Sequence, residues 1–255
     1  MLGAMTPTVE LYTFAISHFS EKVRWVLDLE GIVYEEKQLL PGLHPFTTRR
    51  LASKACVPVL RQGHMVIQGS AAIIRALPGI FGARRLEPAA SMASACDELE
   101  TMADRAFGVG VQKIAYGALL QRRQRMIELW SLGRKPWTKL FYAVTYPLLA
   151  RLVKRMYRTN PEEVERAKAA FRRALNRTDE LLSNNAFLLG DSLTRADVCV
   201  AALIAPFLDP PEHAVRFAPL PDELRAFADE FKDGPTARHA LRIYREYRLP
   251  PSSNA

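Results

Sequence analysis

The stretch Ala55-Cys56-Val57-Pro58-Val59-Leu60 decides the fold of this 255-residue chain. It places a proline inside an apolar, β-branched run, although a proline cannot donate to a strand ladder and is kept out of central strands. A cis peptide bond before Pro58, at the start of the strand, removes this conflict because it turns the backbone to face a ligand. The amide and carbonyl of Val57 would then pair with a peptide-like molecule as an added strand does.

Upstream of this stretch, the sequence predicts a strand, a helix, a second strand and a short helix. Residues 9–16 alternate as a strand does, and a helix then opens near Ser17 with Phe19, Val23, Val26 and Leu27 on one face. Gly31 ends that helix, residues 32–37 form a second strand parallel to the first, and residues 47–53 form the short helix.

Downstream, the pattern predicts a β-hairpin and a third helix. Residues 57–60 and 65–67 flank a turn at residues 62–64, and Gly69-Ser70 begins a helix that Pro78-Gly79 ends. The predicted order is therefore βαβαββα, which gives an α/β domain over residues 1–82.

Everything after this domain is predicted as helix, which gives an all-α domain over residues 87–255. The expected helices are residues 89–116, 121–130, 137–157, 161–182, 194–207, 222–231 and 235–247. The fourth of them starts strongly, with Asn160 as N-cap and Pro161 at the first helical position.

Composition narrows the class of protein. Apolar residues make up 49% and charged residues 24% of the chain, as in ordinary soluble proteins. The three cysteines are widely spaced and the histidines scattered, so we expect neither disulfides nor a metal site. No apolar run reaches the length of a membrane span, and Met1–Thr8 lacks the core of a signal peptide, which together predict a cytoplasmic protein. A net charge of +8 favours anionic partners, but no nucleic-acid-binding motif is present.

The order of elements, together with the segment Ser17-His18-Phe19-Ser20-Glu21-Lys22-Val23-Arg24, resembles the cytosolic glutathione transferase family, and most of all its bacterial members of the serine and cysteine type. The resemblance implies a thioredoxin-like N-terminal domain and a helical C-terminal domain. It also implies a homodimer in which a glutathione thiolate, with glutathione as co-substrate and no metal, attacks a small hydrophobic electrophile.

In this resemblance Ser17 takes the position of the catalytic residue. A hydroxyl that donates to the sulfur of glutathione stabilises the thiolate, the nucleophilic form, and the helix dipole assists it. Ser20 is the reserve candidate, and His18 is expected at the rim. The alternative is that Ser17 is an N-cap and nothing more.

The resemblance also assigns the glutathione-binding residues. Val57, before Pro58, would pair with the cysteinyl backbone, and Ser70 would hold the γ-glutamyl carboxylate at a helix N-terminus. The family has an acidic or amide residue immediately before this serine, whereas this chain has Gly69, with Gln68 one position away. His44 is expected near the glycyl carboxylate, and Arg49 and Lys54 are the other cations available nearby.

Three features of the second domain complete the prediction. Residues 187–197 resemble the signature of the family's helical domain, in which Thr194 caps a helix and Asp197 reaches back to the cap amide. The electrophile pocket is expected to be lined by Arg105, Phe107, Gln112 and Tyr116. The basic, aromatic segment 121–158 favours a helical hairpin, whose aromatic side chains line the electrophile pocket or a dimer contact, over a helix that lies on a membrane. Contact with a membrane surface is therefore not expected.

Two other functions remain open from the sequence. One is a binding or scaffolding protein that kept the fold without catalysis, which Gly69 favours. The other is an isomerase or dehalogenase that uses glutathione as a cofactor. A thiol oxidoreductase is disfavoured, because its usual nucleophile position holds Ser17 and not a cysteine.

Overall fold

The computed structural model describes residues 8–248. This part of the chain divides into two compact units that meet in sequence between Arg85 and Leu86. The predicted second domain also included residues 249–255, which lie outside the described residues.

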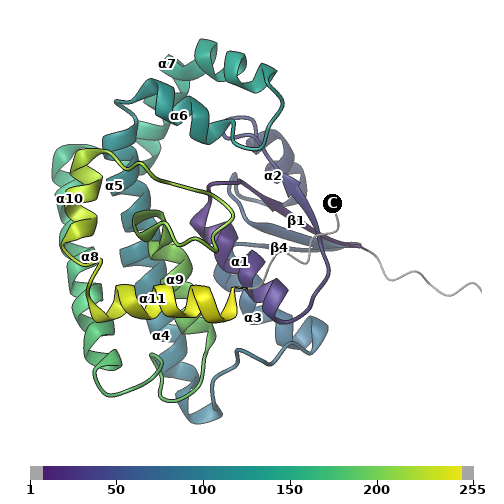
Figure 1. Cartoon of the computed structure of the whole chain (residues 1–255). Coiled ribbons are helices and arrows are strands. Elements are labelled where there is room, and N and C mark those ends of the chain that lie inside the picture. The colour runs from purple at the N-terminus through teal and green to yellow at the C-terminus, as the bar shows by residue number, and fades with distance from the viewer. Residues whose placement is uncertain (1–7, 249–255) are drawn as a thin grey trace, which may run out of the picture. The chain divides into compact units, whose positions relative to one another are not determined.

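The first unit is a four-stranded sheet with three helices (Figure 1). Its elements are, in chain order, β1 (Val9–Thr13), α1 (His18–Leu29), β2 (Glu35–Gln38), α2 (Pro45–Leu51), β3 (Val59–Gln62), β4 (Met65–Gln68) and α3 (Ser70–Phe81). The strand order is β2-β1-β3-β4, with β1 and β2 parallel and the other pairs antiparallel. The predicted thioredoxin-like order βαβαββα is confirmed.

The core of this unit lies between the sheet and the helices α1 and α3, which contact each other. Leu11 and Leu60, which are register partners on β1 and β3, are both fully buried, as are Trp25 on α1 and Ile73 on α3. Burial of such apolar side chains is the main stabilising term of a fold of this size. The core holds in place the ends of the strands, where the site lies.

Several predicted boundaries in this unit were wrong. The first strand ends at Thr13 and not at residue 16, the short helix is Pro45–Leu51 and not 47–53, and the third strand is Val59–Gln62 and not 57–60. Helix α3 continues through Pro78 to Phe81 and ends at Gly82, which has a φ of 69°. A proline removes only one intrahelical hydrogen bond, so packing can carry a helix past it. The second strand begins at Glu35 and not at residue 32, because residues 32–34 precede the pairing of Glu10 with Glu35.

The second unit is entirely helical. It contains the 3-10 turn η1 (Ala90–Met92), α4 (Ala93–Ala103), the π-helical turn η2 (Asp104–Gly108), α5 (Val109–Leu119), α6 (Arg123–Trp130), α7 (Trp137–Tyr157), α8 (Pro161–Leu182), α9 (Arg195–Leu208), α10 (Asp222–Asp229) and α11 (Pro235–Tyr247). Helix α9 is buried along almost its whole length and contacts α4, α5, α10 and α11. It is the centre of this unit's core.

The predicted helix over residues 89–116 is not continuous. A π-helical turn at Asp104–Gly108 separates α4 from α5. Such a turn adds one residue to the helical ladder and needs neither proline nor glycine, so the apolar periodicity does not reveal it. Helices α7, α8 and α11 have the predicted bounds.

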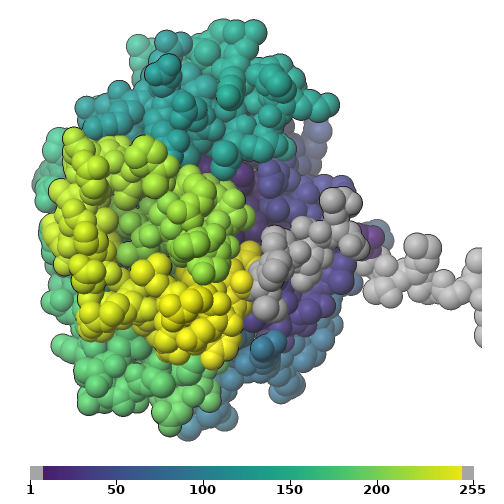
Figure 2. Space-filling view, in the orientation of Figure 1, coloured from purple at the N-terminus to yellow at the C-terminus, as the bar shows by residue number. Residues whose placement is uncertain are grey.

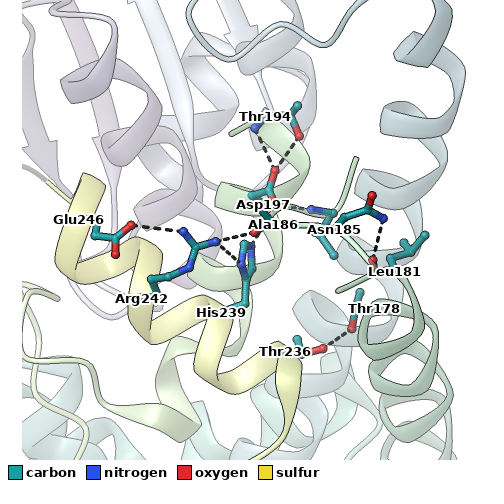
Figure 3. A network of polar contacts seen from close by, with 11 residues as sticks. Thr178, Leu181, Asn185, Ala186, Thr194, Asp197, Thr236, His239, Arg242 and Glu246 are labelled. Carbon is teal, nitrogen blue, oxygen red and sulfur yellow. Dashed lines mark hydrogen bonds and ion pairs between the residues drawn. The ribbon is translucent and has the colours of Figure 1, made fainter. Parts of the chain in front are cut away.

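The capping box that opens α9 is present and extended by α11 (Figure 3). The buried Asp197 carboxylate accepts from the amide of Thr194 at 2.9 Å and from its hydroxyl at 2.8 Å. It also accepts from the amide of Leu188 at 2.8 Å, and Nε2 of His239 on α11 lies 2.9 Å from it. One carboxylate thus joins the 187–197 segment to the start of α9 and to α11.

Candidate functional site

The predicted site residues gather at one edge of the first unit's sheet. The antiparallel register pairs Tyr12 of β1 with Val59 of β3, and Val59 with Gln68 of β4. The end of β1, the start of β3 and the end of β4 therefore lie side by side. Ser17 follows the first of these ends, Val57-Pro58 precedes the second and Gly69-Ser70 follows the third.

The backbone of Val57 is available at this edge. The Val57–Pro58 peptide bond is cis, as predicted, and the carbonyl of Pro58 accepts from the amide of Gly69 at 2.9 Å. Within the described part of the chain, neither the amide nor the carbonyl of Val57 has a hydrogen-bond partner. Val57 is half-buried, and unpaired backbone groups of this kind are those with which an extended ligand pairs as an added strand.

Ser17 is the N-cap of α1, and its Oγ accepts from the amide of Ser20 at 3.2 Å. This bond uses an oxygen lone pair and leaves the hydroxyl proton free to donate elsewhere, because a serine hydroxyl is both donor and acceptor. The reserve candidate Ser20 is fully buried, and its Oγ has no partner among the described residues. Of the two candidates for the catalytic serine, half-buried Ser17 is therefore the more accessible. His18, expected at the rim, is buried.

A buried guanidinium supports the loop that carries Ser17. Arg24 donates from Nη2 to the carbonyl of Phe14 at 2.8 Å, and that carbonyl also accepts from the amide of Ser17 at 3.2 Å. Arg24 also donates from Nε to the carboxylate of Glu36 at 2.7 Å, and the hydroxyl of Thr13 donates to the same oxygen at 2.5 Å. The sequence shows Arg24 in the resembling segment but gives no sign of these partners.

The side chain of Gln68 holds the loop before the cis peptide bond. Its Oε1 accepts from the amide of Lys54 at 3.0 Å, while Nε2 donates to the carbonyls of Lys54 at 2.6 Å and Cys56 at 2.9 Å. These three bonds occupy the amide group, so Gln68 acts on the site through the loop. Gln68 is among the residues predicted to bind glutathione, and its direct contact with glutathione stays a prediction.

His44 is a neutral bridge and not a cation. The amide of Gly42 donates to Nδ1 at 3.3 Å, which leaves the proton on Nε2, 3.2 Å from the carbonyl of Ala55. The ring also makes an edge contact with Phe14, at a centroid distance of 4.8 Å. Burial lowers the pKa of His44, whereas its bond to Ala55 opposes that change. The predicted place of His44 near the glycyl carboxylate stays a prediction.

The N-terminus of α3 offers free amides at the same edge. Gly69 occupies the N-cap position with φ 99° and ψ 137°, no side chain caps the helix, and its first turn has no acidic residue. Buried Ser70 is the first helical residue. Uncapped amides at a positive helix end attract an anion. The backbone angles also show why a glycine stands where the family has a side chain, because residues with a Cβ rarely adopt that φ.

The structure spreads the four expected pocket residues over different surroundings in the helical unit. Arg105 is exposed on η2, whereas Phe107 is fully buried with its ring 4.8 Å from that of Phe171 on α8. Gln112 is half-buried on α5, and Tyr116 stacks on Tyr157 of α7 at 5.0 Å. Phe107 thus belongs to the helical core, and a shared pocket for the four remains a prediction.

The described residues contain no group of His, Cys, Asp and Glu side chains with the geometry to hold a metal ion. All three cysteines are free, and burial raises the pKa of the Cys56 thiol beside the cis peptide bond. Cys56 is thus disfavoured as the thiolate of this edge, because the charged form is the nucleophile.

Comparison with solved structures places these two units in a known architecture. The chain is similar to glutathione transferase GSTFuA3 from Phanerochaete chrysosporium, at 16% identity and a TM-score of 0.62, over 96% of this chain and 99% of that one. It is also similar to a glutathione S-transferase of Ceriporiopsis subvermispora in complex with glutathione, at 15% identity and a TM-score of 0.63, with the same coverage. A third is the beta-etherase LigF from Sphingobium sp. strain SYK-6, at 18% identity and a TM-score of 0.59, over 92% of this chain and 99% of that one. At these identities the likeness shows the fold alone.

No curated protein matches the sequence. The family comparison is more informative, because it matches the two units separately and in order. Residues 11–85 match the glutathione S-transferase N-terminal domain, and residues 140–231 match the glutathione S-transferase C-terminal domain. The chain belongs to the glutathione S-transferase family.

Proposed function

We propose that the first unit binds glutathione and that the Ser17 hydroxyl stabilises its thiolate for attack on a small hydrophobic electrophile. The observation that carries this proposal is the unpaired amide and carbonyl of Val57, at an edge shared with Ser17 and with the free amides of α3. Glutathione is a peptide-like anion with one thiol, so it uses all three features at once.

The cysteinyl backbone and the γ-glutamyl end of glutathione each have a counterpart at this edge. The cysteinyl backbone pairs with Val57 as an antiparallel strand does, and the γ-glutamyl carboxylate binds at Ser70 and the α3 amides. Gln68 and His44 act indirectly, because both fix the loop at Lys54–Cys56 that precedes Val57. This arrangement positions the thiol before the reaction, which is where proximity and orientation contribute to the rate.

Ser17 supplies the electrostatic part of the mechanism. Its proton is not used by the N-cap bond, so it can donate to the thiolate sulfur while Oγ continues to cap α1. The amide end of α1 adds a positive potential at the same point. Both effects favour the thiolate over the thiol, whose proton is released to solvent. The sulfur then forms a bond to the electrophilic carbon, and the leaving group departs with the electron pair of the bond that breaks.

The test is titration calorimetry with reduced glutathione, followed by conjugation kinetics with a nitroaromatic halide. We expect Ser17→Ala to keep most of the binding but to lose thiolate absorbance and about 10- to 100-fold of kcat at neutral pH, the equivalent of one charge-assisted hydrogen bond. Ser20→Ala is the matched control, because the hydroxyl of Ser20 is buried and unpartnered. Equal losses in the two variants would refute the role of Ser17.

A non-catalytic binding protein is the second candidate, and Gly69 is the observation that favours it. Glycine has no side chain, so this position offers no acidic or amide group to the γ-glutamyl end. Absence of any calorimetric signal with glutathione would select this reading. Because one similar fold belongs to a beta-etherase, an ether substrate joins the nitroaromatic in the kinetic panel. Recovery of glutathione without a conjugate would indicate instead a reaction in which it is a cofactor.

A further inference from the structure

The outward face of α7 carries an apolar stripe that no part of the described chain covers. Its side chains recur every three or four residues and are up to 73% exposed. Leu132, which precedes the helix, is 39% exposed. The stripe consists of Trp137, Leu140, Val144, Leu148, Leu152 and Met156. The opposite face holds Tyr142 and Tyr146, which are buried against Trp130 of α6 at centroid distances of 5.5 and 5.7 Å. Helices α6 and α7 therefore pack as the predicted hairpin, and the outer face of α7 remains open. From the sequence, a hairpin and a membrane contact are alternatives, but an open outer face is compatible with both.

Cations without partners accompany this stripe. Helix α7 has no acidic residue over its 21 positions. Six exposed cations on it and beside it have no ion-pair partner among the described residues, namely Lys135, Lys139, Arg151, Lys154, Arg155 and Arg158. The neighbouring helix α8 is different, because its Arg166, Lys168, Arg172 and Arg177 all pair with carboxylates. Exposed cations without an ion pair occur elsewhere in the described chain too, for example Arg49, Arg105 and Arg173. What distinguishes α7 is that its unpaired cations lie on a helix that also carries the exposed apolar stripe.

We propose that the α7 face, defined by the stripe and the six cations above, docks on an anionic lipid bilayer with the helix lying in the plane of the interface. An amphipathic face with apolar side chains and cations gains both from burial in the acyl boundary and from attraction to anionic headgroups. A 21-residue helix is about 32 Å long, which gives a convex face that a flat surface can meet without a matching groove. Trp137, 55% exposed, stands at one end, where a bilayer interface favours tryptophan.

Charge argues against a second copy of the chain as the occupant. Two α7 faces brought together would place two sets of unpaired cations against each other, with no carboxylate on either helix.

In Figure 2 the segment containing α6 and α7, coloured teal, forms the upper margin of the helical unit. Among the described residues, no helix combines the length and apolar character that crossing a bilayer requires. The proposal is therefore for a helix that lies on the membrane, and it is independent of glutathione binding.

The test is co-sedimentation of the full chain with vesicles of phosphatidylcholine alone and of phosphatidylcholine containing about one third phosphatidylglycerol, at low and high salt. Trp137 gives a second readout, because the other two tryptophans, Trp25 and Trp130, are buried. We expect binding to the anionic vesicles only, weakened by salt, together with a blue shift of the fluorescence that Trp137→Phe removes. No binding to anionic vesicles at low salt would overturn the proposal.

Two paired substitutions separate the face from general charge effects. Arg151→Glu with Arg155→Glu should weaken vesicle binding at least about 30-fold, since each cation near the surface contributes about fivefold. Arg173→Glu with Arg177→Glu makes the same change of net charge on exposed positions of α8 and should have less than about a third of that effect. Equal effects of the two pairs would refute docking by α7.

The apolar stripe has its own variant. Val144→Gln with Leu148→Gln keeps the charge and alters two side chains that are 73% and 61% exposed, so the fold should remain intact by circular dichroism. We expect about a tenfold loss of vesicle binding or more. If this variant binds vesicles as the parent does, or if it instead abolishes self-association measured by sedimentation velocity, the face has a protein partner and the proposal fails.

Discussion

Replacement of Arg24 by lysine tests whether the guanidinium sets the shape of the loop before α1. The structure gives Arg24 two strong hydrogen bonds, to Glu36 at 2.7 Å and to the Phe14 carbonyl at 2.8 Å. A lysine ammonium keeps the charge but lacks the planar fork, so it can retain one of these bonds and not both in their present directions. The lost bond is charge-assisted and its partner is largely buried, so we expect the free energy of unfolding to fall by about 1.5–3 kcal/mol.

A double-mutant cycle assigns this loss to the Arg24–Glu36 pair. Glu36→Gln removes the charge but leaves an oxygen that accepts from Thr13, whose hydroxyl lies 2.5 Å away. Because the two side chains are in contact, the combined variant should be less destabilised than the sum of the single variants, by about 1–2 kcal/mol. Urea unfolding followed by tryptophan fluorescence measures these free energies. In a background in which Trp130 and Trp137 are replaced by phenylalanine, the signal comes from buried Trp25 on α1 and reports on this unit alone.

The cycle also separates stability from activity. Arg24→Lys should lower kcat with glutathione more than Glu36→Gln does, because Arg24 and Ser17 share the Phe14 carbonyl. A change below about 0.5 kcal/mol in Arg24→Lys, or strict additivity in the cycle, would refute the reasoning. In that case the loop is held by the Ser17 cap and the sheet, with no contribution from the buried pair.

Three further results are expected. Gly69→Glu should destabilise the protein by about 1–3 kcal/mol, because the backbone at this position has a φ of 99°. Gly79→Glu, in an open helical position of α3, should not be destabilising in this way. Equal urea midpoints of the two variants would contradict the prediction. Asp197→Asn should lower the free energy of unfolding by about 2–4 kcal/mol, since the buried carboxylate has four polar partners. The control is Asp191→Asn at the exposed neighbouring turn, and equal melting temperatures of the two variants would disprove the prediction. Burial lowers the pKa of His44 in the folded state below its unfolded value of about 6.5. As the pH falls through this range, the unfolded state binds more protons than the folded state, so the free energy of unfolding decreases until the folded pKa is passed. His44→Gln should remove this part of the decrease between about pH 7.5 and 5.5, and an unchanged slope of the free energy of unfolding against pH would contradict it.

The sequence predicts those parts of the fold that local chemistry determines. Pro58 in a β-branched run predicts the cis peptide bond, and the Thr194–Asp197 spacing predicts the cap of α9. Asn160 followed by Pro161 predicts the start of α8, and the amide of Glu163 indeed donates to Asn160 at 2.8 Å. In each case the residue that identifies the feature also makes the bond or fixes the dihedral angle.

The parts that depend on distant partners could not be predicted. Gln68 looks like a ligand residue in the sequence, yet its amide is turned toward Lys54, 14 positions away, by the path of the intervening loop. His44 looks like a cation, yet Gly42 and Ala55 fix it as neutral. The stripe on α7 likewise shows periodicity in the sequence, but only the packing of Tyr142 and Tyr146 shows which face remains exposed.

The two ends of the proposed glutathione site should affect different kinetic constants. Gly69 stands where the γ-glutamyl end would bind, and a missing contact there weakens substrate and transition state alike, by about 1–3 kcal/mol or roughly 10- to 100-fold in affinity. Uniform binding of this kind changes KM and leaves kcat unaltered. Ser17 acts on the sulfur, whose charge changes during the reaction, so its loss should lower kcat. The site combines a glycine at φ 99° with a free serine hydroxyl at the α1 N-cap. This combination predicts an enzyme with a high KM for glutathione and a kcat that depends on Ser17.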